Sequence, residues 1–313
     1  MSALPTALTD YLTMRRALGF KLYDVGLCLH QFVRFAEAEG AAFITTALAL
    51  RWATQPAQAS PTYWARRLGM VRQFAQYCSA LDARTEIPPP ALLPYRYQRK
   101  APYLYSDEEI GRLLQAAQQL PSPTGLRAAT YDTLLGLLAA TGMRISEPIA
   151  LDRTDVDLPC GALTIRRTKF GKSRWLPLHP TTCQALQHYA ALRDRLYPSP
   201  TTPSFFLSER GTRLTANTVE QTFVQLSHRI GLRGPEETHG PRLHDLRHGF
   251  AIRTLLRWYR AGVDVEQRLP ELAAYLGHAH VNDTFWYLSA TPELLQLAAE
   301  RVAPSPQARE EVL

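Results

Sequence analysis

Prolines divide this chain more sharply than any other feature of its sequence. Four of them fall within the first seven residues of segment 88–105, and each fixes its φ angle and lacks an amide hydrogen. A continuous helix cannot cross this segment, so we predict an extended linker. It separates an N-terminal domain, residues 1–87, from a C-terminal domain, residues 106–302. Residues 303–313, rich in Pro, Gln and Glu, are predicted to be loosely ordered.

Apolar residues recur at helical spacing through most of both domains. In the N-terminal domain two such segments end at Gly19 and Gly40, and Ser60 followed by Pro61 has the form of a helix start. Four helices of this kind predict a small bundle. The C-terminal domain is also helical in pattern, except in segment 161–178, where the periodicity becomes alternating around a turn. The chain is therefore predicted to be mainly α with a small β-sheet or hairpin.

The composition argues against several classes of protein. Of the 313 residues, 46% are hydrophobic and 20% are charged, as in globular chains. No apolar run of about 18 residues predicts a membrane span, and the first residues lack the pattern of a secretory signal, so a cytoplasmic protein is expected. The cysteines are scattered, which favours neither a zinc site nor a disulfide framework: Cys28, Cys78, Cys160 and Cys183.

Positive charge is concentrated in the first third of the chain. The formal net charge is +7, and residues 1–100 contain twelve lysines and arginines against six acidic residues. This surplus of positive charge favours a polyanion as partner, although a basic surface that faces only solvent would have the same net charge. The cations predicted to contact DNA lie on the helix that begins at Pro61 and in the linker: Arg66, Arg67, Arg72, Arg96, Arg99 and Lys100.

Two arginines lie in segments that are otherwise apolar. Arg144 follows a glycine that ends a predicted helix, and Glu147 is three residues further on. A buried guanidinium needs an ion-pair partner or an anionic ligand, so the pair is either a structural salt bridge or part of a site. His244 and Arg247 are also three apart, which places them on one face of a helix, where both can bind one anion. Alone, this spacing is a weak signal.

Lysine is rare in this chain, and two of its four lysines, Lys169 and Lys172, occupy the predicted hairpin turn. Arginine keeps its proton at neutral pH, whereas a lysine with a tuned pKa can act as a general acid. A solvated turn explains the same residues without any chemistry.

The stretch LGHAHVNDTFWYL, near the C-terminus, places two histidines close to an aromatic group. On one unbroken helix His278 and Tyr287 would face opposite sides, because nine residues make about two and a half turns. Gly277 is expected to end the preceding helix, and Asn282 or Asp283 to cap a short new one. The imidazole and the phenol can then converge.

Together these side chains suit phosphoryl transfer that uses neither a metal nor another cofactor. Guanidinium groups can neutralise phosphate oxygens, a tyrosine can attack when a histidine takes its proton, and a lysine can protonate the leaving sugar oxygen. The paired carboxylates of two-metal chemistry are missing from these segments. Trp286, beside the tyrosine, is expected to anchor the last segment in apolar surroundings.

Four segments, in order and spacing, resemble the motifs of the tyrosine recombinases, also called the phage integrase family. They are ATGMRISEPIAL, TKFGKSRWLPL, HDLRHGFA and LGHAHVNDTFWYL. The resemblance covers residues 106–300, and the helical N-terminal part is more loosely similar to that family's DNA-clamp domain. It implies that Arg144 and Arg247 grip the scissile phosphate. It also implies that Lys169 is the general acid and that Tyr287 forms a 3′-phosphotyrosyl link.

The resemblance implies further roles. His244 would assist as base and hydrogen-bond partner, and His278 would contact the phosphate. Three positions are accessory: Glu147, Lys172 and Trp286. Two residues depart from the family's usual pattern, because Pro148 stands where a helix former is usual and Phe170 where glycine is commoner.

The implied function is site-specific DNA recombination, used for integration, excision or transposition by a mobile element. The implied partners are double-stranded DNA with a specific site, which would place the protein on the nucleoid, and three more copies of the chain in a tetramer. Each copy would lodge its last helix, residues 292–303, in a neighbour, and helper recombinases or DNA-bending proteins could take part. The alternatives are a type IB topoisomerase, which rejoins the same strand, and a catalytically silent DNA-binding accessory protein.

A test of the acid follows from these roles. Lys169→Ala should abolish covalent adduct formation on an ordinary duplex and recover it on a duplex with a 5′-bridging phosphorothiolate, because sulfur leaves without an acid. Gel separation of the protein–DNA adduct measures both. Without rescue, the acid role would pass to Lys172 or to a histidine.

Overall fold

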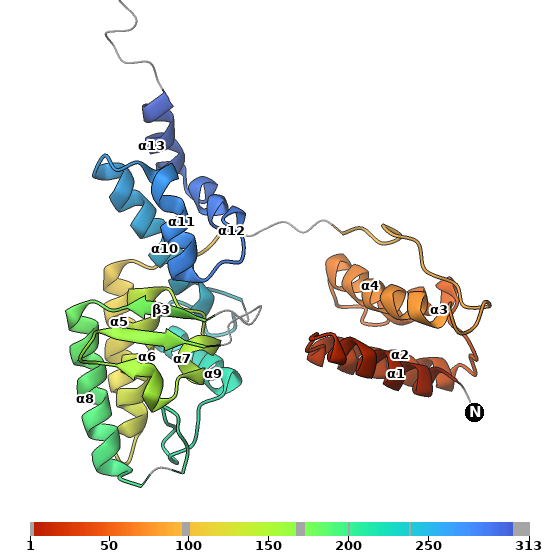
Figure 1. Ribbon diagram of the computed structural model, residues 1–313, viewed down its shortest axis with the longest axis horizontal. Coiled ribbons are helices and arrows are strands. Elements are labelled where there is room, and N and C mark those ends of the chain that lie inside the picture. Colours follow the sequence, from red (N-terminus) through yellow and green to blue (C-terminus); the bar gives the residue numbers. More distant parts are fainter. Residues whose placement is uncertain (1–2, 96–100, 167–172, 200, 238, 303–313) are drawn as a thin grey trace, which may run out of the picture. The chain divides into compact units, whose positions relative to one another are not determined.

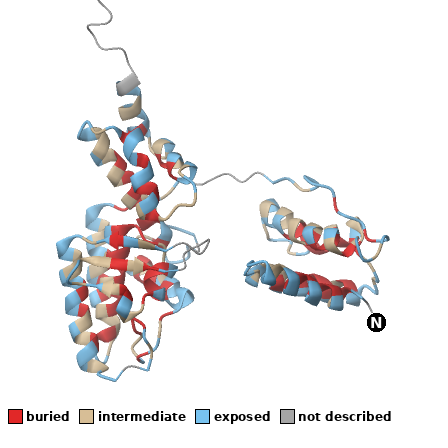
Figure 2. Ribbon diagram, viewed as in Figure 1, coloured by how far each residue is buried: buried red, intermediate tan, exposed pale blue. Residues whose placement is uncertain are grey.

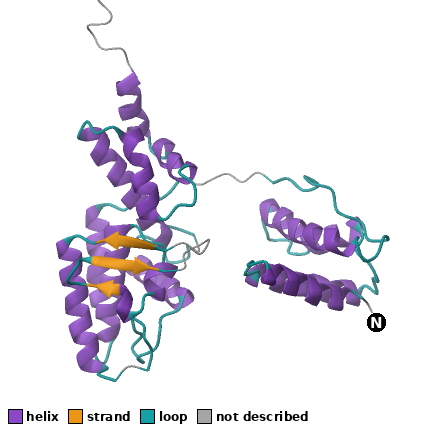
Figure 3. Ribbon diagram, in the orientation of Figure 1, coloured by secondary structure: helices purple, strands orange, loops and turns teal. Residues whose placement is uncertain are grey.

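The computed structural model describes five stretches of the chain: residues 3–95, 101–166, 173–199, 201–237 and 239–302. They belong to two units, residues 1–100 and 101–313, and the division falls inside the segment predicted to be a linker (Figure 1). Helices make up most of both units, and the described part of the chain holds one small sheet (Figure 3). The predicted fold class, mainly α with a small β-sheet, is confirmed.

Four helices form a bundle in the described part of the N-terminal unit. Its apolar core includes the large side chains of Phe32, Trp52 and Phe74, which come from three different helices. Figure 2 shows such buried residues along the inward sides of the helices. The last helix starts as predicted, because the side chain of Ser60 accepts a hydrogen bond from the amide of Tyr63. The helices are α1 (Leu4–Ala17), α2 (Tyr23–Ala38), α3 (Thr46–Thr54) and α4 (Pro61–Cys78).

The predicted DNA contact of Arg67 is wrong, because this side chain belongs to the bundle. Arg67 is 7% exposed, its guanidinium lies 3.8 Å from the ring centroid of Trp52, and Nη2 donates to the Trp52 carbonyl at 2.9 Å. Its neighbour Arg66 is exposed, and Arg72 is half-buried. Three other predicted DNA contacts lie outside the described residues: Arg96, Arg99 and Lys100.

The C-terminal unit is built around α6 (Leu126–Thr141), which packs against α5 (Asp107–Gln118), α8 (Pro180–Leu196) and α10 (Leu243–Arg260). The other elements are α7 (Ser146–Ala150), η1 (Arg153–Asp155), β1 (Val156–Asp157), β2 (Ala162–Ile165), β3 (Arg174–Pro177), α9 (Ala216–Arg229), α11 (Val265–Leu276), α12 (Asn282–Phe285), η2 (Trp286–Ser289) and α13 (Pro292–Val302). None of the described helices is long and apolar enough to cross a membrane.

The three strands pair antiparallel in the order β1-β2-β3, and the register decides which side chains reach the core. Leu163 faces Leu176 across β2 and β3, and Ile165 faces Arg174. The three apolar residues are buried, whereas Trp175 is 80% exposed. Because side chains alternate along a strand, Arg174 lies on the core side of the sheet. Strand β1 was not predicted.

A second apolar core of the C-terminal unit forms where α10 packs against α11, η2 and α13. These elements lie together in the blue part of Figure 1. Each of the four elements contributes buried residues to this core, for example Leu255, Leu272, Tyr287 and Leu294. Tyr287 therefore belongs to a packed core.

The role of Arg67 in the bundle can be measured. Arg67→Met keeps the side-chain length but removes a buried hydrogen bond and a cation–π contact, so it should destabilise the N-terminal unit by about 1–3 kcal/mol. Arg66→Met, on the exposed neighbouring position, should change stability by less than about 0.5 kcal/mol. Thermal unfolding followed by tryptophan fluorescence compares the two, and equal effects would contradict the assignment.

Candidate active site

The first part of the site forms where α6 ends. Gly142 adopts a φ of +62° and ends the helix, and Arg144 enters the turn that leads to α7. The amide of Arg144 donates to Oε2 of Glu147 at 2.9 Å, and its Nη1 donates to Oε1 at 3.3 Å. Pro148 lies in the first turn of α7, where amide hydrogens have no partner within the helix, so this departure removes no helical hydrogen bond.

Glu147 is buried and joins two arginines from distant segments. Arg174, the first residue of β3, donates from Nη1 and Nη2 to the two carboxylate oxygens, each at 2.9 Å. Burial alone would raise the pKa of Glu147, but the hydrogen bonds and charge of Arg174, with the amide of Arg144, hold that pKa below its ordinary value. The carboxylate is ionised at neutral pH and fixes both guanidinium groups.

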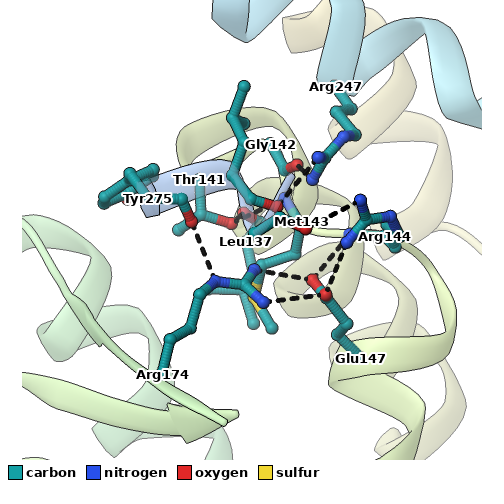
Figure 4. Close-up of polar contacts among 11 residues, drawn as sticks. Leu137, Thr141, Gly142, Met143, Arg144, Glu147, Arg174, Arg247 and Tyr275 are labelled. Atoms are coloured by element: carbon teal, nitrogen blue, oxygen red, sulfur yellow. Dashed lines mark hydrogen bonds and ion pairs between the residues drawn. The ribbon is translucent and has the colours of Figure 1, made fainter. Parts of the chain in front are cut away.

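Three successive carbonyl groups at the carboxyl end of α11 each accept a hydrogen bond from a different arginine. The pairs are Tyr275 with Arg174 Nε (2.9 Å), Leu276 with Arg247 Nη2 (2.8 Å) and Gly277 with Arg144 Nη2 (3.0 Å). Figure 4 shows the three guanidinium groups converging. A helix end of this kind has carbonyls without helical partners and a partial negative charge, both of which cations satisfy.

Glycine is strongly favoured at the end of α11. Gly277 has a φ of +70°, and a Cβ there would lie 2.6 Å from Nη1 of Arg174. The left-handed backbone and the close approach of the guanidinium therefore both disfavour a side chain.

Arg247 is the most buried cation of the site, at 2% exposed. Its Nη1 also donates to the carbonyl of Gly142 at 2.7 Å. Burial, and then repulsion from Arg144, lowers the pKa of Arg247 to about 10, so it is still charged at neutral pH. Glu147 contacts Arg144 and Arg174 but not Arg247, so one carboxylate stands against three guanidinium groups and positive charge is in excess. A cluster of this kind is suited to an anion.

The tyrosine and a histidine meet beside this cluster, as predicted. The rings of His278 and Tyr287 stack with centroids 6.2 Å apart and planes 13° apart. The predicted cap is wrong, because α12 begins after Val281 with no side-chain cap. Instead, the buried hydroxyl of Thr284 lies 2.7 Å from Nδ1 of His278 and ties the new turn to the imidazole. Trp286 is partly buried against the second apolar core of the C-terminal unit, to which Tyr287 belongs, as expected of an anchor.

His248 and His278 contact the tyrosine, His244 packs against His248, and all three histidines favour the neutral form. Burial is the first cause for each, and it lowers the pKa of His244, His248 and His278 to about 4. The second cause is repulsion by Arg247 for His244 and His278, and by His244 for His248. His244 is exposed at the surface of α10, and repulsion by Arg247, Arg242 and Arg144 adds to the lowering of its pKa.

The sequence interpretation missed two residues of this site. It named His244 as the base for the tyrosine, but the structure places Nδ1 of His248 3.0 Å from the hydroxyl oxygen of Tyr287. It also missed Arg174, although the alternating pattern of β3 was a signal that this arginine faces inward. The predicted acid Lys169 and the accessory Lys172 lie outside the described residues.

Among the described residues, no group of three or more His, Cys, Asp or Glu side chains is arranged to hold a metal ion.

The order of the segments that build this cluster also matches a known family. Residues 104–293 match the phage integrase family. The chain belongs to this family, the tyrosine recombinases. The resemblance inferred from four sequence segments is confirmed, and the protein is a site-specific recombinase enzyme.

Individual relatives support the same assignment. This recombinase is 49% identical over 306 residues to the integrase/recombinase y4rB of Sinorhizobium fredii (strain NBRC 101917 / NGR234), covering 96% of this chain and 98% of that protein. It is 29% identical over 239 residues to the tyrosine recombinase XerC of Chlamydia caviae, covering 76% and 71%. Its fold is similar to that of the Tn1549 transposon integrase in complex with transposon right end DNA, with a TM-score of 0.63 at 17% identity, covering 95% and 99%.

The lowered histidine pKa values predict a pH dependence of stability. Because the folded pKa values of His248 and His278 lie near 4, below the ordinary 6.5, the unfolded chain binds more protons between these values. The free energy of unfolding should therefore fall as the pH drops from about 6.5 to 4, by on the order of 2 kcal/mol per histidine. Urea unfolding at a series of pH values measures this. His278→Asn should show a shallower fall, and an unchanged slope would contradict the assignment.

Proposed function

We propose that this recombinase cleaves and rejoins DNA through a covalent 3′-phosphotyrosyl intermediate, with Tyr287 as the nucleophile. The observation that supports it most is that Tyr287 and His278 stack beside the point where the three arginine side chains converge. Tyr287 also lies close enough to Arg247 for the negative charge of an ionised phenol to raise the pKa of the guanidinium. A phenol next to a surplus of fixed positive charge is suited to attack a phosphodiester.

In this proposal Arg144 and Arg247 bind the scissile phosphate. The side chain of Arg144 is 24% exposed and held by Glu147, so it can meet a phosphate from outside without a change of rotamer. Arg247 donates to two carbonyl groups. These hydrogen bonds fix the guanidinium but do not neutralise its positive charge as a carboxylate would. Pre-positioned cations favour the added negative charge of the transition state.

The remaining roles concern protons and storage of the bond energy. Lys169 protonates the leaving 5′ oxygen, and His244 and His278 donate hydrogen bonds to the phosphate. The phosphotyrosyl ester keeps the energy of the broken bond, so a 5′-hydroxyl can reverse the step without ATP or a metal ion.

The wider proposal concerns DNA and assembly. The duplex carries a specific site and lies against cations of α4 such as the exposed Arg66 and the half-buried Arg72. Four copies act on two duplexes, linked by their last helices. The fold resembles a transposon integrase that binds transposon DNA, and the closely similar y4rB is an integrase/recombinase by name. These likenesses support integration, excision or transposition of a mobile element, with or without helper proteins.

The nucleophile can be identified by trapping. The wild type should become covalently attached to a nicked suicide duplex that carries its site, in the presence of EDTA, because the cut strand diffuses away. Tyr287→Phe should give no adduct, since it lacks the attacking oxygen. Denaturing gels measure the adduct, and duplexes from both flanks of the gene supply candidate sites.

Tyr275→Phe is a matched control, because this phenol also lies beside the arginine cluster, with its hydroxyl 3.5 Å from the carbonyl of Pro177. It should keep the adduct. An adduct with Tyr287→Phe would remove Tyr287 from its role. Rejoining only of the original strand, without exchange between two labelled duplexes, would favour the type IB topoisomerase alternative.

A further inference from the structure

The roles proposed so far leave out the histidine that contacts the nucleophile. Nδ1 of His248 lies 3.0 Å from the hydroxyl oxygen of Tyr287. The His248 ring also packs against the rings of His244, Trp286 and Tyr287, with centroid distances of 4.7, 5.4 and 5.5 Å. The imidazole is therefore held on several sides, with one nitrogen at the phenol.

We propose that His248 is the group that accepts the proton of Tyr287 when the phenol attacks the phosphodiester. The inference rests on the proposed function and names the base within it.

The step balances in both directions. During cleavage the bond between Tyr287 Oη and phosphorus forms, and the bond between phosphorus and the 5′ oxygen breaks. The phenolic proton passes along the hydrogen bond to Nδ1 of neutral His248, while the leaving oxygen takes a proton from the proposed acid, Lys169. During rejoining the 5′-hydroxyl attacks the ester and returns its proton to the lysine, and the imidazolium protonates the departing phenolate.

Burial makes a protein base necessary here. Tyr287 is 2% exposed and belongs to the apolar core shared by α10, α11, η2 and α13. Bulk water has little access to its hydroxyl, so the proton needs a nearby acceptor on the protein. His248 is part-buried and reaches the hydroxyl from α10, whereas His244, one turn earlier on the same helix, is exposed.

The charges around His248 are consistent with this role. On its own helix and just before it stand His244, Asp245, Arg247 and Arg242, and from η2 the facing group is Tyr287. Burial, then His244, lowers the pKa of His248 to about 4, so the ring is neutral at pH 7, the form that can accept a proton. A phosphodiester bound by the arginines adds negative charge to the site, which offsets their repulsion and favours the imidazolium.

The experiment compares two variants on the nicked duplex that the wild type cleaves, with single-turnover adduct formation measured from pH 6 to pH 10. His248→Ala removes the acceptor. His248→Asn keeps a hydrogen-bonding oxygen near the place of Nδ1 but cannot take a proton. Both should be slower than wild type by roughly 10²–10⁴-fold at pH 7. Their rates should rise steeply toward pH 10, where a phenol ionises without a base, so the gap to wild type narrows.

His188→Asn is the matched control, because His188 is exposed on α8, away from the described contacts of the site. It should cleave at the wild-type rate at every pH. Added imidazole should accelerate His248→Ala, by filling the space left by the ring, and should not rescue Tyr287→Phe.

Two results would overturn the inference while leaving the proposed function intact. Wild-type rates for His248→Asn would show that His248 only holds the phenol, and an equal loss at every pH for both variants would show a structural role. Thermal unfolding of each variant distinguishes a folding defect from a loss of proton transfer. If His248→Ala does not fold, His248→Asn, the smaller change, tests the inference alone. No adduct with the wild type on any flanking duplex would overturn the proposed function, and this inference with it.

Discussion

Three guanidinium groups converge on the carboxyl end of α11, and the rest of the site is arranged around that contact. Arg144, Arg174 and Arg247 come from the turn after α6, from the sheet and from α10, and each donates to a different carbonyl of this one helix end. Three distant segments are thereby brought to one place. Glu147 compensates only part of the charge. Holding uncompensated cations in a protein interior costs free energy, and an anionic ligand would remove that cost.

The same helix end also sets the position of the nucleophile. The left-handed turn at Gly277 sends the chain into His278 and then into the short turns that bury Tyr287 in an apolar core. The phenol is therefore placed by packing rather than by a ligand. Burial, and after it the positive charge of Arg247, lowers the pKa of His278, so the charge that suits an anion also helps to keep this imidazole neutral.

Much of the site could be predicted from the sequence because its residues stand in short local patterns. The break at Gly277 predicted that His278 and Tyr287 meet, and the spacing of Arg144 and Glu147 predicted their ion pair, as the structure has them. The error at Arg67 has a simple cause. Consecutive residues on a helix point about 100° apart, so Arg66 and Arg67 look alike in the sequence while one faces solvent and the other the bundle core.

The sequence by itself determined the helical fold class, a division inside segment 88–105 and several of the residues that meet in the site, because periodicity, capping and turn chemistry act over a few neighbours. Only the tertiary structure decided which partner each polar group takes. Arg174 reaches Glu147 across 27 residues, and His248 reaches the hydroxyl of Tyr287 across 39. Such contacts depend on how whole elements pack, and a local pattern defines a face of an element without saying what will lie against it.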